Sequence, residues 1–429
     1  MTIKAQYAGD AQGAAAADGP FGWYRRASAS ARRAFWSCKI GYALDAMDTM
    51  FLAFVIPALM ATWGITRAEA GLVGTVTLLS SALGGWVAGI LSDRIGRVKT
   101  LQVTIVWFSV FTFLCALAQS FDQLLWARGL MGLGFGGEWT AGAVLIGEAI
   151  AAGDRGKAVG TVQAGWALGW GVSALLYTIV FSVLPGAMAW RALFAIGLLP
   201  ALFVIPLRRM VQEPEVHARQ RAREESSGEH TSFLQIFSKY GFTTLRAAIL
   251  TTGAQGGYYA ITIWMPTWLK TAQHLSVVGT GGYLSVIIAG SYIGYLTSAA
   301  LNDRIGRRLT LIVYAAASMA IAFVYTRIPM SNGMLLALGF PLGFAASGIF
   351  AGMGAFLSEL FPTRVRGSGA GFCYNFGRAV GATFPFLIGI VAKTMTLGAA
   401  ISVFAASAYG LVMLAALILP ETRGAQLED

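Results

Sequence analysis

Charged residues are scarce in this sequence. Asp, Glu, Lys and Arg together make up 12% of its 429 residues, which is about half of their share in a typical soluble domain. Hydrophobic residues account for 56%. This balance excludes an ordinary water-soluble fold.

Cysteine and histidine are rare as well. The three cysteines are unevenly spaced in or beside apolar segments and predict neither a disulfide framework nor a metal site. No histidine lies inside an expected membrane helix, and no nucleophile, base and orienting acid form a recognisable set. A G-x-x-x-x-G-K-[ST] phosphate loop is also missing. We therefore expect neither an enzyme nor an ATP-driven pump, and no cofactor.

What the sequence does have is long apolar segments. A helix that crosses a bilayer needs roughly 20 mostly apolar residues. Pro185, Pro266 and Pro341 interrupt the apolar pattern, but proline is tolerated in membrane helices. The segments predict twelve transmembrane helices, at 38–62, 69–91, 100–118, 124–149, 157–181, 189–207, 241–269, 276–301, 309–327, 333–358, 367–391 and 398–419.

The net charge of +11 is concentrated in alternate loops. Because positive residues stay on the cytoplasmic side, this pattern predicts a multi-pass inner-membrane protein with both termini in the cytoplasm. It offers no support for a nucleic-acid partner. We expect residues 1–37 to be a disordered cytoplasmic tail and residues 420–429 to be a short C-terminal cytoplasmic tail.

The chain contains an internal duplication. GILSDRIGRVKTL at 89–101 returns as AALNDRIGRRLTL at 299–311, 210 residues later. Glu148 and Arg155 return as Glu359 and Arg366, at an offset of 211. These echoes predict two six-helix bundles, 38–207 and 241–419. The charged linker between them, 208–240, could be an amphipathic helix on the membrane surface or a solvated tether.

Several motifs together resemble the major facilitator superfamily. They are the two DRxGR loops, RGLMGLGFGGE at 128–138, the paired Glu to Arg-Gly loops and PETRG at 420–424. The resemblance covers residues 38–424. It implies an all-α fold of two pseudo-symmetric bundles around a central cavity that opens alternately to each side of the membrane, and we expect a functional monomer.

A finer resemblance lies in four segments: LDAMDTMF at 44–51, GGE at 136–138, AGWALGW at 164–170 and NFGRAVGATFP at 375–385. They are similar to bacterial metabolite:proton symporters, including sialate, aromatic-acid and nicotinate carriers. This resemblance leaves the substrate open.

Ionisable residues inside a membrane are costly and therefore indicate function. Asp45 and Asp48 share one face of the first helix. Arg128 on the fourth helix can reach Asp48, and the resemblance to sugar:proton porters points to the same pair. If Arg128 leaves when Asp48 takes up a proton, the pair is a proton switch. The alternative is a permanent structural salt bridge.

Glu138 lies at a depth comparable to that of Asp45 and is a second candidate proton carrier. It could instead serve packing or hydrogen bonding. The glycines that precede it in the sequence predict close approach of the fourth helix to a neighbour.

Arg378 lies near the midplane of the second half, where no acidic residue is at a similar depth. We expect it to anchor the carboxylate of an anionic substrate. The alternative is an ion pair across the cavity with Asp45, Asp48 or Glu138. The other candidate substrate-binding residues, any of which could simply pack, are Gln163, Trp166, Gln255, Tyr258 and Asn375.

Charged residues in the repeated loops are expected to form cytoplasmic gates. The alternative is that they only stiffen these loops and set the membrane topology. The gating candidates are Asp93, Arg94, Arg97, Glu148, Arg155, Asp303, Arg304, Arg307, Glu359 and Arg366. Gates of this kind require contacts that differ between states.

The sequence therefore predicts proton-coupled uptake of a small organic anion, such as a mono- or aromatic carboxylate. The alternatives are a proton-coupled antiporter that exports a drug or metabolite, and a sugar:proton symporter. The expected partners are the substrate, protons and the lipid bilayer.

Overall fold

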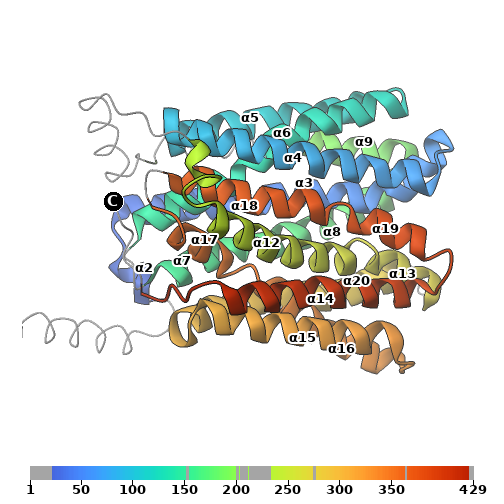
Figure 1. Ribbon diagram of the computed structural model, residues 1–429. Helices are drawn as coiled ribbons and strands as arrows, with labels where there is room; N and C mark the ends of the chain where they lie inside the picture. The colour runs from blue at the N-terminus through green and yellow to red at the C-terminus, as the bar shows by residue number, and fades with distance from the viewer. Residues whose placement is uncertain are drawn as a thin grey trace, which may run out of the picture.

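The computed structural model describes residues 22–150, 154–199, 202, 211, 233–273, 277–362 and 365–424. In these ranges all regular structure is helical (Figure 1). The first half contains α2 (Gly22–Arg26), α3 (Ala29–Trp63), α4 (Arg67–Ile95), α5 (Arg97–Leu117), α6 (Phe121–Ala149), α7 (Arg155–Gln163), α8 (Gly165–Val183) and α9 (Gly186–Ile196).

The second half begins with a short 3₁₀ helix, η2 (Phe233–Ile236). It continues with α12 (Gly241–Thr262), α13 (Met265–Ala272), α14 (Val277–Ile305), α15 (Arg307–Arg327), α16 (Asn332–Gly348), α17 (Met353–Glu359), α18 (Arg366–Gly381), α19 (Phe384–Val391) and α20 (Leu397–Ile418).

The predicted all-α architecture is confirmed, and each expected span except 189–207 coincides with one helix or with two consecutive helices. The pairs are α7–α8, α12–α13, α16–α17 and α18–α19. Helix α9 covers the beginning of 189–207, and most of the residues beyond 199 lie outside the described ranges. Proline explains two of the breaks, since Pro266 and Pro385 lie in the first turns of α13 and α19. Within the described residues, eight helical segments are long and apolar enough to cross a membrane.

The sequence prediction was wrong at the beginning of the first half. Residues 22–37, expected to belong to a disordered tail, form α2 and the start of α3. Ser28 begins α3 by accepting a hydrogen bond from the Ala31 N–H at 3.1 Å. Residues 1–21, most of the expected linker 208–240 and residues 425–429 lie outside the described ranges.

Glycines let helices pack closely at equivalent places in the two halves. Gly84 of α4 lies against the Leu133 backbone of α6, and Gly294 of α14 lies against the Phe344 backbone of α16. These contacts are related by the offset of the duplication, since 84 + 210 = 294 and 133 + 211 = 344. The internal repeat of the sequence is therefore also a repeat of backbone packing.

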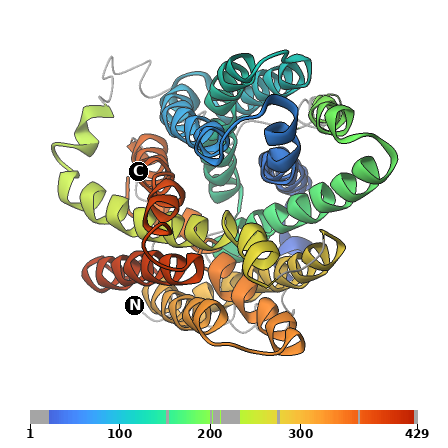
Figure 2. The same ribbon diagram turned by 90° about the vertical axis from the view of Figure 1, so that its right-hand side faces the viewer.

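The two halves meet along a seam that runs the length of the molecule. Helix α4 packs against α18, and α14 packs against α7 and α8. Viewed along the helices, most of the blue-to-green first half lies above the yellow-to-red second half (Figure 2). We call the end with α2, α7 and α17 the α7 end and the opposite one the α13 end (Figure 1).

Outside the bundle, the helices expose large apolar side chains such as Leu83, Val183 and Leu414. A surface of this kind suits a lipid environment. At the start of α4, outside the apolar span, the Thr66 N–H and hydroxyl donate to Glu69 at 2.7 and 2.8 Å. These bonds hold the pKa of the Glu69 carboxyl below its usual range.

Candidate functional site

Five ionisable side chains that the sequence predicted to lie inside the membrane are buried between the helices. They are Asp45, Asp48, Arg128, Glu138 and Arg378, each at most 3% exposed. Their surroundings differ. Asp48 and Arg128 form a salt bridge, whereas Arg378 has no acidic partner among the described residues.

Asp48 and Arg128 join α3 to α6. Arg128 Nη1 donates to Asp48 Oδ2 at 3.2 Å. The guanidinium also lies 4.4 Å from the ring centroid of Phe194. Among the described residues, Arg128 Nε and Nη2 have no hydrogen-bond partner in good geometry, and neither has Asp48 Oδ1. A buried ion pair held by one hydrogen bond leaves polar atoms unsatisfied. A conformational change of the protein can therefore break the pair.

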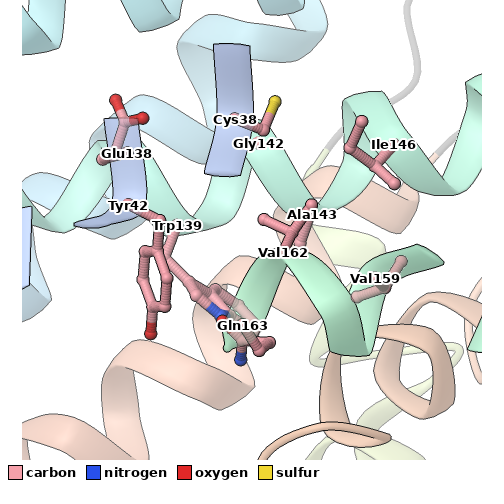
Figure 3. Close-up of a pocket in the computed structure, with 10 residues that line it drawn as sticks. All are labelled: Cys38, Tyr42, Glu138, Trp139, Gly142, Ala143, Ile146, Val159, Val162 and Gln163. Carbon is pink, nitrogen blue, oxygen red and sulfur yellow. The ribbon is translucent and has the colours of Figure 1, made fainter. Parts of the chain in front are cut away.

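Glu138 lies ten residues beyond Arg128 on α6, which is about 15 Å along a helix. It borders a small cavity together with Cys38 and Tyr42 of α3 and Gln163 of α7 (Figure 3). The cavity has a volume of about 10 Å³, room for roughly one water molecule. In this state no substrate fits beside Glu138. Asp45 is buried one turn along α3 from Tyr42.

Arg378 of α18 is surrounded by aromatic rings from both halves. Its guanidinium carbon is 4.9 Å from the Phe135 ring centroid and 5.1 Å from that of Tyr374. Arg378 Nη1 donates weakly to the Ser81 hydroxyl of α4 at 3.5 Å, and Tyr259 of α12 is within hydrogen-bonding reach.

Arg378 has no acidic partner among the described residues, and its Nε has no hydrogen-bond partner. The ion pair across the cavity, which the sequence left open as an alternative, is therefore not formed. A desolvated guanidinium with free donors among flat rings can bind a carboxylate through two parallel hydrogen bonds.

The remaining candidate binding residues gather at the seam. Trp166 Nε1 donates to the Tyr258 hydroxyl at 3.0 Å, and Gln163 Nε2 donates to the Phe350 carbonyl at 3.4 Å. Both bonds connect the first half to the second. Gln255 accepts from the Tyr259 hydroxyl at 3.0 Å and donates to the Tyr374 carbonyl at 2.8 Å.

Asn375 is placed differently from the other candidates. Its amide nitrogen donates to the Gly371 carbonyl of its own helix at 2.9 Å, and its side chain packs against Gly85 of α4. This geometry places Asn375 at the contact between α18 and α4.

Sequence reasoning missed an aromatic stack that crosses the seam. Trp139 of α6 and Tyr374 of α18 have ring centroids 3.4 Å apart and an interplanar angle of 11°. Tyr374 precedes Arg378 by one helical turn, and Trp139 follows Glu138 directly. These positions beside the two charges were the only signal available in the sequence.

At the α7 end, the duplicated loops form equivalent ion pairs. Arg97 donates to Glu148 through Nη2 at 3.2 Å, and Arg307 donates to Glu359 through Nη2 at 2.9 Å. The two ion pairs occupy equivalent positions in the duplicated halves, since 97 + 210 = 307 and 148 + 211 = 359.

Asp303 carries this network across the seam. Its Oδ2 accepts the Lys157 backbone N–H of α7 at 3.1 Å, and its Oδ1 accepts from Arg307 at 2.8 Å. The acid of the second half thus binds the first turn of a first-half helix. This contact joins the two halves at the α7 end.

The other predicted gating residues have separate roles. Arg155 donates to the Gly147 carbonyl at 2.7 Å and Arg366 to the Ser358 carbonyl at 3.1 Å, near the ends of α6 and α17. Arg94 and Arg304 are exposed. The side chain of Asp93 lies outside the described residues.

Comparison with known proteins gives a consistent result. A family model described as Major Facilitator Superfamily matches residues 40–385. The chain is 42% identical over 413 residues to a probable 4-methylmuconolactone transporter of Cupriavidus pinatubonensis, covering 95% of both chains. It is 29% identical over 399 residues to a cis,cis-muconate transport protein of Acinetobacter baylyi, covering 90% of this chain and 94% of that one.

Among solved structures, the chain is similar to the proton:xylose symporter XylE. The TM-score is 0.78 at 19% identity, with 94% of this chain and 98% of the other covered. At this identity, the likeness concerns the fold.

Proposed function

The chain belongs to the Major Facilitator Superfamily and is a membrane transporter, and on that premise we propose that it imports a small organic carboxylate together with protons. The observation that carries the proposal is Arg378, a buried cation without an acidic partner among the described residues and with aromatic rings of both halves around it. Such a site suits a flat, conjugated anion.

The names of similar proteins support this substrate class. One is a probable transporter of 4-methylmuconolactone and another transports cis,cis-muconate. We propose a mono- or dicarboxylate with a ring or conjugated double bonds, held by Arg378, with Tyr259 and Gln255 close enough to orient it.

Proton coupling is assigned to Asp48 and Arg128. While the guanidinium contacts Asp48 at 3.2 Å, the charged carboxylate is favoured. When the helices move apart, a carboxylate left buried without its cation is strongly disfavoured, so it takes up a proton. Breaking the pair and loading a proton then become one event. Glu138 is a second site at which a proton could be held.

We assign the α7 end to the cytoplasm, because the Lys- and Arg-rich loops around Arg97 and Arg307 lie there. The contact between Asp303 and Lys157 then closes the protein on the inside. Transport proceeds by rocking of the two bundles about the central site in the inner membrane.

The proposal is tested with purified protein in liposomes. Benzoate, nicotinate and cis,cis-muconate are offered under an inward proton gradient, with nicotinamide as the neutral match to nicotinate and xylose as the test for sugar transport. We expect accumulation of one or more anions, by about tenfold per pH unit for a single proton, and its collapse with a protonophore. Xylose uptake without anion uptake would refute the anion assignment, and proton-driven loss of preloaded anion would indicate an exporter.

A further inference from the structure

A second cavity lies at the α13 end of the second half. Its volume is about 330 Å³, within the range of small-molecule sites. The walls come from α13, the α15–α16 connection and the beginning of α20. It shares no residue with the surroundings of Arg378, and all of its lining residues belong to the second half.

The wall chemistry is cationic and aromatic. Arg327 supplies a positive charge, and the described residues that line the cavity include no Asp or Glu. Arg327 is exposed and forms no ion pair with a described residue. Trp268 and Tyr325 lie side by side, with ring centroids 5.7 Å apart. An arginine next to two aromatic faces is a common way to hold a flat carboxylate.

Hydrogen-bond donors complete the lining. Trp268 lines the cavity, and its indole N–H is a hydrogen-bond donor. The Thr396 hydroxyl accepts the Ala399 N–H at 3.3 Å and keeps its own proton to donate. Because Thr396 begins α20, the positive end of that helix dipole also borders the cavity. The Tyr325 hydroxyl is buried without a partner.

We propose that this cavity is a second binding site for an organic anion, where a small aromatic or conjugated carboxylate is held before it reaches Arg378. The identification of the bound anion as the transported substrate rests on the proposed function and on the assignment of the α7 end to the cytoplasm. Binding itself depends only on the lining. The cavity then faces the side from which cargo arrives.

The cavity and the central site use consecutive helices of the chain. Helix α13 follows α12 after the break at Pro266, and α12 carries Tyr259 and Gln255 beside Arg378. An anion bound at the α13 end raises the local concentration of substrate available to the central site. Loss of the peripheral site therefore raises the KM for uptake and leaves kcat unchanged.

Binding stoichiometry tests the proposal. Radiolabelled benzoate and cis,cis-muconate are equilibrated with the purified full chain, with Arg378→Ala, with Arg327→Gln and with the double variant. We expect two equivalents on the wild type, one on each single variant and none on the double variant. The matched control is Arg246→Gln in α12, whose guanidinium lies 3.5 Å from the Phe242 ring centroid. Thermal melts confirm that all variants are folded.

The outcomes separate this proposal from the proposed function. A single equivalent on the wild type, lost in Arg378→Ala and unchanged in Arg327→Gln, overturns the second site and leaves the transporter assignment standing. Binding that persists in Arg378→Ala and disappears with Arg327→Gln supports the second site even if liposomes show no proton-driven uptake. No binding of either anion to the wild type overturns both the second site and the proposed anion transport.

In uptake measurements, Arg327→Gln should raise the KM about tenfold at unchanged kcat. An unchanged KM contradicts the role of the second site in delivering substrate.

Discussion

At the scale of single residues, the buried arginines differ in what they contact. Arg128, Arg97 and Arg307 each donate to a carboxylate of their own half. Arg378 lies against two rings, contacts the Ser81 hydroxyl and has the Tyr259 hydroxyl within reach, and it contacts no carboxylate within the part of the chain that the structure describes. Its charge is therefore available to a ligand, which makes it the residue whose replacement is most informative.

Replacing Arg378 by lysine keeps the charge and removes the planar, two-pronged donor. Because hydrogen bonds to charged groups contribute about 1.5–3 kcal/mol, we expect the KM for carboxylate uptake to rise about 10- to 100-fold. Initial-rate kinetics in liposomes measure this, with Arg246→Lys as the control that should stay at the wild-type value. An unaltered KM in Arg378→Lys would mean that Arg378 does not hold the carboxylate in two-pronged fashion.

Replacing Asp48 by asparagine removes a titratable group and leaves its size unchanged. We expect loss of accumulation under a proton gradient, because the variant cannot load a proton at this position. Exchange of labelled for unlabelled substrate should persist. The control is Asp122→Asn, an exposed acid in the first turn of α6. If Asp48→Asn still concentrates substrate as well as Asp122→Asn, another group carries the proton.

The buried charges were predictable because a charge stands out in an apolar sequence. Asp48, Arg128 and Arg378 were identified in this way, and the structure buries all three. Trp139 and Tyr374 were not identified, since aromatic residues are frequent in apolar helices. Only the packing of α6 on α18 shows that these two rings face each other.

At the scale of helices, close packing depends on particular glycines. A side chain at Gly84 would collide with the Leu133 backbone, whereas Gly74 of the same helix has open space around it. We expect Gly84→Ala to destabilise the fold by about 1–3 kcal/mol and Gly74→Ala to have little effect. Melting curves of detergent-purified protein measure both. Equal melting temperatures for the two variants would show that α4 and α6 can separate at no cost.

The closed α7 end depends on a side chain that reaches across the seam. Asp303→Asn removes the charge that binds the first turn of α7 and pairs with Arg307. We expect faster hydrogen exchange of the first amides of α7 and slower uptake. Asp122→Asn is the control, because Asp122 is an exposed acid in the first turn of α6, away from α7. Identical exchange in both variants would exclude Asp303 from the gate.

The positions of the helices could be predicted from the lengths of the apolar segments, but the ends of the helices and the breaks within them could not. Ala164 divides α7 from α8 with helical dihedral angles, φ −61° and ψ −17°, and no proline or polar run in the sequence indicates it. Residues 29–37, predicted to belong to the tail, begin α3; Arg32 and Arg33 lie before the apolar run that defined the predicted span. In the structure both donate to backbone carbonyls at the helix start.

At the scale of the whole molecule, the two bundles are joined by few polar contacts near the centre. Trp166 bonds to Tyr258, and Trp139 stacks on Tyr374. Rocking that opens the α7 end must separate Trp139 from Tyr374. We expect a change in tryptophan emission when substrate is added at low pH, and its loss in Trp139→Phe. The control is Trp126→Phe, whose side chain is 74% exposed; persistence of the change in Trp139→Phe would contradict this opening.

The solitary charge of Arg378 also determines how the carrier responds to voltage. When empty, it has a negative Asp48 and two positive arginines, Arg128 and Arg378. When loaded with a proton on Asp48 and a monoanion on Arg378, it has the same sum. Under the proposed mechanism, the same charge then crosses the field in each direction, so the complete cycle moves no net charge and is driven by the pH difference and the substrate gradient. A second proton or a dianion breaks this balance, and each unbalanced charge couples about 2.3 kcal/mol per 100 mV to transport.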